Sequence, residues 1–145
     1  MKKGNLELIQ ARYDAVNAHD VDRFRGFYAD SVVWRDPGTP RPAKGRRAVG
    51  RRLEAWIAAV PNLKWTLDDL FGEGDRLCAQ FTFTGTHKGV VADARGNALA
   101  PTDQRLRIPG VGVYVVDGGK IVDSHIYFDL AAFRGADRKE EPPSS

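Results

Sequence analysis

The sequence is poor in the residues that build disulfides and metal sites, with one cysteine and three histidines among 145 residues. The single Cys78 excludes an internal disulfide and a zinc site made of several cysteines. No cluster of acidic residues accompanies the histidines, so the sequence predicts no metal site. No apolar run is long enough to span a membrane, and the N-terminal segment MKKGNLELIQ lacks the apolar core of a signal peptide. We therefore expect a cytoplasmic protein with no membrane partner.

The charge excess is small and local. The net charge is +3, and much of it lies in the segment RPAKGRRAVGRR, Arg41 to Arg52. A nucleic-acid-binding protein is expected to show a wider basic stripe and a recognisable motif, and neither is present, so we expect no nucleic-acid partner. The arginines of this segment are expected to form a solvated helix face. The alternative is an anion site for a carboxylated substrate.

Length and composition indicate one globular domain. A chain of 145 residues can bury a sizeable core, and 42% hydrophobic with 28% charged residues is ordinary for such a domain. We assign residues 1–137 to the domain and residues 138–145, RKEEPPSS, to a disordered tail. Residues 1–4 are also expected to contribute nothing to the fold.

Hydrophobic periodicity predicts three helices and five strands in the order α-α-β-α-β-β-β-β. The helices are expected over 6–18, 21–28 and 46–60, and the strands over 31–36, 63–71, 76–87, 104–116 and 121–128, with the fourth strand broken or bulged at Pro109-Gly110. Helices at the start followed by long antiparallel strands indicate an α+β fold. We expect a curved mixed or antiparallel sheet that wraps around the helices as a cone, with the helices on its concave face and an apolar pocket open at one end.

The last predicted strand carries the most chemistry. Because side chains alternate along a strand, Asp123, His125, Tyr127 and Asp129 share one face, while the other face is apolar except for Ser124. Four ionisable groups on one face either line a polar cavity, where they would form a general acid-base site, or meet water. The pattern alone leaves both readings open.

Three motifs resemble those of the SnoaL-like polyketide cyclase relatives within the nuclear transport factor 2-like fold. They are FTFTGTHKG at 81–89, APTDQRLRIPG at 100–110 and DGGKIVDSHIYFD at 117–129. The resemblance spans about Leu6 to Phe133 and implies the cone-shaped fold described above. The chain departs from the family pattern at Ser124, where the family usually has a histidine, and at His125, where it often has tryptophan or arginine.

The resemblance also implies catalytic positions. The aspartate that ends the family's last strand is a general acid-base, and it corresponds to Asp129. The histidine of the G-T-H motif corresponds to His87, and Asp36 lies in a segment similar to the one that holds the base of ketosteroid isomerases. Beside Asp129, His125 is expected to tune the carboxylate or to donate to a substrate oxygen. The alternative is a partly buried histidine that only hydrogen-bonds a neighbour.

Each of these residues also has an ordinary structural explanation. Asp129 can cap the turn that follows it, and Asp36 before Pro37-Gly38 is a common way to open a turn. His87 lies beside Gly85, whose missing side chain leaves room for a ligand, but it is also placed to be a histidine at the rim of a loop. The aromatic residues expected to contact substrate are equally suited to a core: Tyr13, Trp34, Trp56, Phe83 and Tyr127.

Together these observations predict a cofactor-independent enzyme for a small hydrophobic organic substrate. A carboxylate and histidine set in an apolar pocket would isomerise or cyclise a polyketide-like or cyclic carbonyl compound. The alternatives are an epoxide hydrolase, in which Arg105 or Arg107 helps to hold a water, and a non-catalytic binding or scaffold domain. The uncovered face of the sheet, with Thr82, Thr84 and Thr86, is expected to form a two-fold homodimer.

Overall fold

The computed structural model describes residues 2–93 and 95–134, and for 2, 3 and 134 only the backbone. Its elements are α1 (Lys2–Asn17), α2 (Val21–Gly26), β1 (Tyr28–Arg35), β2 (Ala43–Lys44), α3 (Arg46–Ala59), β3 (Lys64–Glu73), β4 (Arg76–Thr86), β5 (Val91–Ala92), β6 (Ala98–Leu99), β7 (Arg105–Asp117), β8 (Lys120–Phe128) and the 3-10 helix η1 (Leu130–Arg134). The predicted tail, residues 138–145, lies outside the described residues. None of the described helices is long and apolar enough to cross a membrane.

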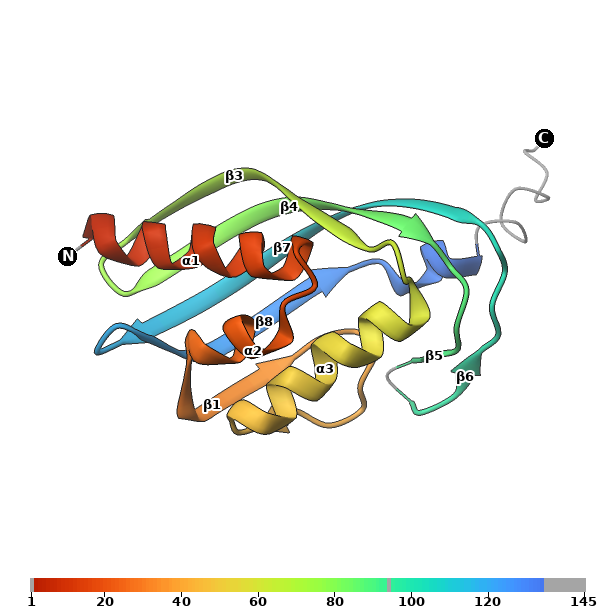
Figure 1. The fold of residues 1–145 in the computed structure, drawn as a ribbon, viewed down its shortest axis with the longest axis horizontal. Coiled ribbons are helices and arrows are strands. Elements are labelled where there is room, and N and C mark those ends of the chain that lie inside the picture. The colour runs from red at the N-terminus through yellow and green to blue at the C-terminus, as the bar shows by residue number, and fades with distance from the viewer. Residues whose placement is uncertain (1, 94, 135–145) are drawn as a thin grey trace.

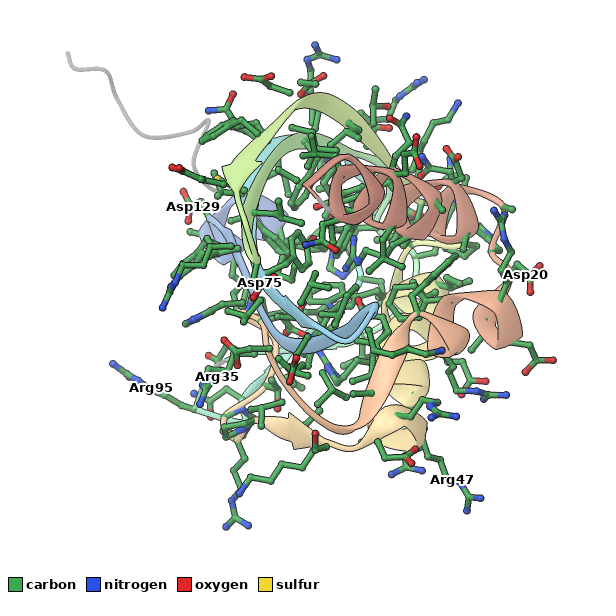
Figure 2. All side chains as sticks on the ribbon, turned by 90° about the vertical axis from the view of Figure 1, so that its left-hand side faces the viewer. Asp20, Arg35, Arg47, Asp75, Arg95 and Asp129 are labelled. Atoms are coloured by element: carbon green, nitrogen blue, oxygen red, sulfur yellow. The ribbon has the colours of Figure 1, made fainter. Side chains whose placement is uncertain are left out.

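The main sheet has six strands in the order β2-β1-β8-β7-β4-β3. The pair β1–β8 is parallel and the other pairs are antiparallel, so the sheet is mixed. The helices α1, α2 and α3 all lie on one face of this sheet (Figure 1). In the view turned by 90°, the helices stand on one side and the other face of the sheet is free of them (Figure 2). The predicted α+β fold is confirmed, and the two faces are called inner and outer below.

The boundaries of some elements differ from the predicted ones. The first helix begins at Lys2 rather than Leu6. Residues 2–4, which were expected to contribute nothing to the fold, therefore belong to α1. The second helix ends at Gly26, because Tyr28 begins β1 and its ring is buried in the core. The short strands β2, β5 and β6 were not predicted, since two residues are too few to show an alternation.

The expected break at Pro109-Gly110 is absent. Strand β7 pairs with β4 without interruption from Arg105 to Val115, and its irregularity lies at Val115/Val116 instead. The pairing of β7 with β8 begins only at Gly110, so Pro109 has β4 as a neighbour on one side and no β8 residue on the other. A strand tolerates proline at such a position because one side of it no longer needs a ladder hydrogen bond.

The core lies between the inner face and the helices, and it is unusually aromatic. Trp65 stacks on Phe81 with ring centroids 4.8 Å apart, and Trp56 lies edge-to-face with Phe83 at 6.0 Å. Both tryptophans and both phenylalanines are buried. Aromatic pairs of this geometry stabilise a fold beyond the area they bury. The Trp65–Phe81 pair therefore joins β3 to β4, and the Trp56–Phe83 pair fixes α3 against the sheet.

Candidate functional site

The polar residues of β8 face outward. Ser124 and Ile126 are buried on the inner face, whereas His125 is partly exposed and Tyr127 is about half exposed, at 49%, on the outer face. The alternation expected from the sequence is therefore confirmed. The apolar side of β8 packs under the helices, and the polar side meets the uncovered surface of the sheet.

A depression of about 630 Å³ crosses this outer face. It is bounded by Asp36, Pro37, Asp68, Gln80, Phe81, Pro109, Gly110, Val111, His125, Ile126, Tyr127 and Phe128. Gln80, Val111 and Tyr127 form a cross-strand row, because the register pairs Gln80 with Val111 and Val111 with Tyr127. The depression thus joins apolar walls to a few polar groups, as small-molecule sites do.

His125 and Tyr127 form a pair inside this depression. Their rings are stacked with centroids 4.0 Å apart, and Nδ1 of His125 lies 2.9 Å from Oη of Tyr127. Burial lowers the pKa of His125, and the positive charge of Arg35 lowers it further, while Asp123 acts in the opposite direction. The imidazole is therefore neutral at pH 7, and one ring nitrogen remains a proton acceptor.

Asp123 and Arg35 close the row of polar groups at the β1 side. They form an ion pair of 3.2 Å between partly exposed side chains, across the parallel β1–β8 pair. Figure 2 shows Arg35 pointing away from the helices. The carboxylate of Asp123 is thereby occupied by Arg35 and stands outside the depression.

Asp36 is placed at the edge of the depression, but its carboxylate is engaged in the protein interior. The side chain has no exposed area and accepts five hydrogen bonds. The donors are Trp34 Nε1 at 2.6 Å, Trp56 Nε1 at 3.2 Å, Arg52 through Nε and Nη2 at 2.9 Å each, and the Gly38 amide at 2.6 Å. A carboxylate that binds a guanidinium in two places and three further N–H groups is held as a structural anion.

Asp129 caps the turn that follows it, which is the structural alternative expected from the sequence. Its side chain is exposed, and Figure 2 shows it pointing into solvent away from the helices. The carboxylate accepts the amide of Ala131 at 3.0 Å, and the Asp129 carbonyl accepts the amide of Ala132, at the start of η1. Asp129 does not line the depression that holds His125, so the structure does not bring the two together. Its catalytic role stays a prediction.

His87 does not line the depression of the outer face and is fully buried. Nδ1 lies 3.1 Å from Oγ1 of Thr102, and the ring stands edge-to-face with Phe133 at 5.1 Å. Burial lowers its pKa, although nearby backbone groups and Asp103 oppose this effect. A side chain at Gly85 would collide with Val60, so the space in that direction is filled. Gly85 also borders a pocket of about 330 Å³, which His87 does not line.

Of the five aromatic residues predicted to contact substrate, only Tyr127 lines the depression. The other four, Tyr13, Trp34, Trp56 and Phe83, are buried in the core. Trp56 also borders a smaller pocket of about 240 Å³ between α3 and β5, together with Arg52 and Val91.

The basic segment partly gathers around a surface pocket. Arg46, Arg47 and Arg51 line a hollow of about 480 Å³ with Arg25 and Lys44, and Asp30 belongs to it too. Arg46 pairs with Asp30 at 2.7 Å, and Figure 2 shows Arg47 reaching into solvent. An anion site at this position stays a prediction. Within 2–93 and 95–134 no three histidine, cysteine or acidic residues gather as a metal site would require.

The sequence reasoning missed Arg12. This arginine is buried on the inner face of α1, in the same stripe as Ile9, Tyr13 and Val16. Burial opposes the charge of Arg12, but the tyrosine oxygens around it leave its pKa raised, so it is protonated at neutral pH. The sequence did contain a signal for this position, because Arg12 falls within the apolar stripe of the first helix. A charged side chain in such a stripe is either buried or turns away from the core.

Comparison with known proteins identifies a family and a shared fold. The model of the SnoaL-like polyketide cyclase family matches residues 7–135, and no curated protein matches the chain. A candidate SnoaL-like polyketide cyclase from Jannaschia sp. CCS1 is 19% identical, with a TM-score of 0.80 over 97% of this chain and 95% of that one. IdmH, a candidate polyketide cyclase from Streptomyces antibioticus, is 22% identical, with a TM-score of 0.73 over 90% and 96%. TerC, co-crystallised with polyporic acid, is 19% identical, with a TM-score of 0.70 over 91% and 96%.

Proposed function

The chain belongs to the SnoaL-like polyketide cyclase family, and from this premise we propose that it moves protons next to a carbonyl group of a polyketide-like or cyclic substrate. The reaction is an isomerisation or an aldol-type cyclisation and needs no cofactor. The observation that carries the proposal is the pair of His125 and Tyr127, hydrogen-bonded within the depression of the outer face.

The geometry of the pair assigns one task to each residue. With Nδ1–H of His125 donating to Oη of Tyr127, Nε2 keeps a lone pair that can accept a proton from carbon. The phenol O–H is then free to donate to the carbonyl oxygen and stabilise the enolate. Return of the proton from Nε2 to another carbon completes an isomerisation. In a cyclisation the enolate carbon attacks a second carbonyl, whose C=O π bond opens to an alkoxide, and Nε2–H returns its proton to that alkoxide oxygen.

Exclusion of water is the remaining requirement for this chemistry. Tyr127 and Phe71 are both 49% exposed on the outer face, which is a large exposure for aromatic residues. A second copy packed sheet to sheet would cover both rings and close the depression. We therefore include the two-fold homodimer in the proposal, and its purpose is to desolvate the His125–Tyr127 pair.

The carboxylates predicted as bases have other tasks in this scheme. Asp36 holds the end of β1 against α3 through Arg52 and Trp56. Asp129 begins η1, and His87 packs between Thr102 and Phe133. The proposed base is therefore an imidazole rather than a carboxylate.

A non-catalytic binding domain is the second candidate. The observation in its favour is that both predicted carboxylate bases are occupied, Asp36 by five hydrogen bonds and Asp129 by the amide it caps. Epoxide hydrolysis has less support. Arg105 and Arg107 border a pocket of about 330 Å³ whose described lining contains no carboxylate to complete an Asp-Arg-Asp set.

Hydrogen–deuterium exchange at the carbon next to a carbonyl tests the proposal without knowledge of the natural substrate. A panel of aryl and cyclic ketones that exchange slowly by themselves is incubated with the protein in D2O and followed by NMR. We expect at least one ketone to exchange faster with the protein than with the heat-unfolded chain. Binding of ketones to the folded protein without any accelerated exchange would instead support the binding domain.

A further inference from the structure

A second basic cluster lies on the outer face, at the end of the sheet where β3 and β7 begin and β4 ends (Figure 1). Lys64, Thr84 and Arg107 form a cross-strand row, because the register pairs Lys64 with Thr84 and Thr84 with Arg107. Each of the three alternates with buried residues of its own strand, so the row points outward. A pocket of about 330 Å³ surrounds it, and we call this the rim pocket. Its lining residues are Asn62, Lys64, Thr84, Gly85, Arg105, Leu106 and Arg107.

The three cations of the rim pocket have no carboxylate to balance them. Lys64, Arg105 and Arg107 take part in none of the ion pairs among the described residues, and no lining residue is acidic. Asp103, two residues before Arg105, is bound by Lys88 at 2.9 Å instead. Like charges gathered on one face of a sheet repel each other, so this cluster lowers the stability of the fold unless an anion joins it.

The neutral side chains of the rim pocket add donors to this charge. Asn62 accepts the amide of Thr86 at 2.8 Å through Oδ1, so its Nδ2 end keeps two N–H donors. The hydroxyl of Thr84 can donate as well. Asp68 supplies no acceptor here, because it accepts the hydroxyl of Thr82 at 2.6 Å and lines the depression rather than the rim pocket. The pocket therefore combines positive charge with a surplus of N–H and O–H donors.

The basic pocket at the start of α3 differs from the rim pocket in this respect. Its lining includes the carboxylate of Asp30, which pairs with Arg46 at 2.7 Å. Figure 2 shows Arg47 of the same pocket reaching into solvent rather than toward its neighbours. That pocket already holds an anion of the chain itself, whereas in the described part of the rim pocket an anion must come from outside.

The charge and the spacing of the donors indicate the class of anion. A carboxylate carries one negative charge, whereas a phosphate monoester carries nearly two at pH 7, which suits three cations better. The planar forks of the two arginines match phosphate oxygens, and the lysine adds a point charge. Directly opposite Cβ atoms of neighbouring strands lie about 5 Å apart, so Lys64 and Arg107 are about 10 Å apart across Thr84. Both side chains are long enough to reach one anion above Thr84.

We propose that the rim pocket binds the phosphate group of a small molecule, as a phosphate monoester or a diphosphate. The donors to its oxygens are Arg105, Arg107, Lys64, the Thr84 hydroxyl and Asn62 Nδ2. The inference does not rest on the proposed function, because the rim pocket shares no lining residue with the depression of His125 and Tyr127. It also lies away from the proposed dimer contact at Phe71, which pairs with Cys78, six residues and about 20 Å along β4 from Thr84.

Inorganic pyrophosphate is the probe, and acetate at the same ionic strength is the control for general charge screening. Amide 1H–15N spectra of the full chain are recorded during each titration. We expect pyrophosphate to shift the amides of Lys64, Thr84 and Arg107 in a saturable way, and acetate to do neither. If neither anion gives saturable shifts, or if both act alike, the proposal is wrong. Shifts centred on residues 44–51 would place the anion at α3 and would also overturn it. A short single-stranded oligonucleotide that binds more tightly than pyrophosphate would contradict a small-molecule site.

Three variants locate the effect. Arg107→Gln removes the charge of an exposed side chain, so it should fold normally and weaken pyrophosphate binding by about tenfold. Thr84→Val keeps the shape of the side chain but removes its hydroxyl, and should weaken binding by about threefold. Arg47→Gln, in the basic pocket of α3, is the matched control and should leave binding unchanged. Equal binding by the wild type and Arg107→Gln, or an equal loss in Arg107→Gln and Arg47→Gln, would overturn the proposal.

Discussion

On the outer face of the sheet, His125 and Tyr127 hydrogen-bond each other and remain in contact with solvent, whereas on the inner face Arg12 is fully buried and has a single hydrogen bond. Strand β8 contributes to both faces, since His125 points outward and its neighbour Ser124 is buried on the inner face. Water reaches the outer pair, whereas Arg12 has no charged partner among the described residues. The difference teaches that adjacent residues of one strand meet opposite surroundings, so only the outer pair can meet a molecule from solvent without a rearrangement of the core.

The largest loss of unfolding free energy is expected at Asp36, whose carboxylate accepts five hydrogen bonds. Asp36→Asn replaces an anion that accepts five hydrogen bonds and leaves the Arg52 guanidinium without its partner. Breaking a buried ion pair costs about 3–5 kcal/mol of unfolding free energy. Urea denaturation measures the change. Asp129→Asn is the matched control, because asparagine also caps and the site is exposed, so its unfolding free energy should change by less than about 0.5 kcal/mol.

A loss near 0.5 kcal/mol at Asp36 would mean that its carboxylate is not held as the hydrogen bonds indicate. A large loss of turnover in Asp129→Asn with unchanged stability would return Asp129 to the mechanism as the base.

The inner face should respond to a single added methyl group. Gly112 and Tyr114 both lie on β7, and the phenol of Tyr114 covers Gly112. A Cβ atom at Gly112 would overlap that ring. Gly112→Ala should therefore displace the phenol, separate Tyr13 from Tyr114 and cost about 1–3 kcal/mol of unfolding free energy. Thermal unfolding measures this loss. Gly118→Ala is unsuitable as a control, because Gly118 has a positive φ of 59° and alanine would be strained there. Gly26→Ala, where a Cβ meets nothing within 4 Å, is the control and should be near neutral.

Acid should destabilise the protein through His87. Burial lowers its pKa in the folded state, so below about pH 6.5 the unfolded chain binds a proton that the folded chain resists. The contribution of neutral His87 to stability is present above that pH and is lost as the pH falls through the folded-state pKa. Melting temperatures between pH 7.5 and 5 should fall less steeply in His87→Gln than in the wild type. Identical slopes would show that His87 is not the group responsible.

The proposed homodimer is expected to give the smallest change in the stability of the folded chain. Phe71 is half exposed on the outer face of β3, at its pairing with Cys78. Phe71→Lys places a charge in the proposed contact and should convert a dimer into a monomer in light scattering at micromolar concentration, with little change in the stability of the folded chain. A wild-type protein that is already monomeric at that concentration would contradict the dimer.

Local patterns predicted the elements, but not the partners of the polar groups. The alternation of β8 and the apolar stripes of the helices are properties of short segments, and they were predicted correctly except at Tyr28, which begins β1 instead of ending the second helix. The task of Asp36 depends on Arg52 and Trp56, which come from α3, and the environment of Arg12 depends on Trp34, Trp65 and Tyr114 from three strands. Such contacts are set by the packing of distant segments, so the sequence left Asp129 open between base and cap and passed over Arg12.

The central claim, that the imidazole of His125 takes a proton from carbon, is tested most directly by the rate of ketone exchange in D2O with His125→Gln. The variant keeps a polar side chain but has no basic nitrogen, so we predict an exchange rate lower by about 10²- to 10⁴-fold than that of the wild type at pH 7. The melting temperature should be unchanged. An exchange rate equal to that of the wild type would contradict the account and move the reaction away from the outer face.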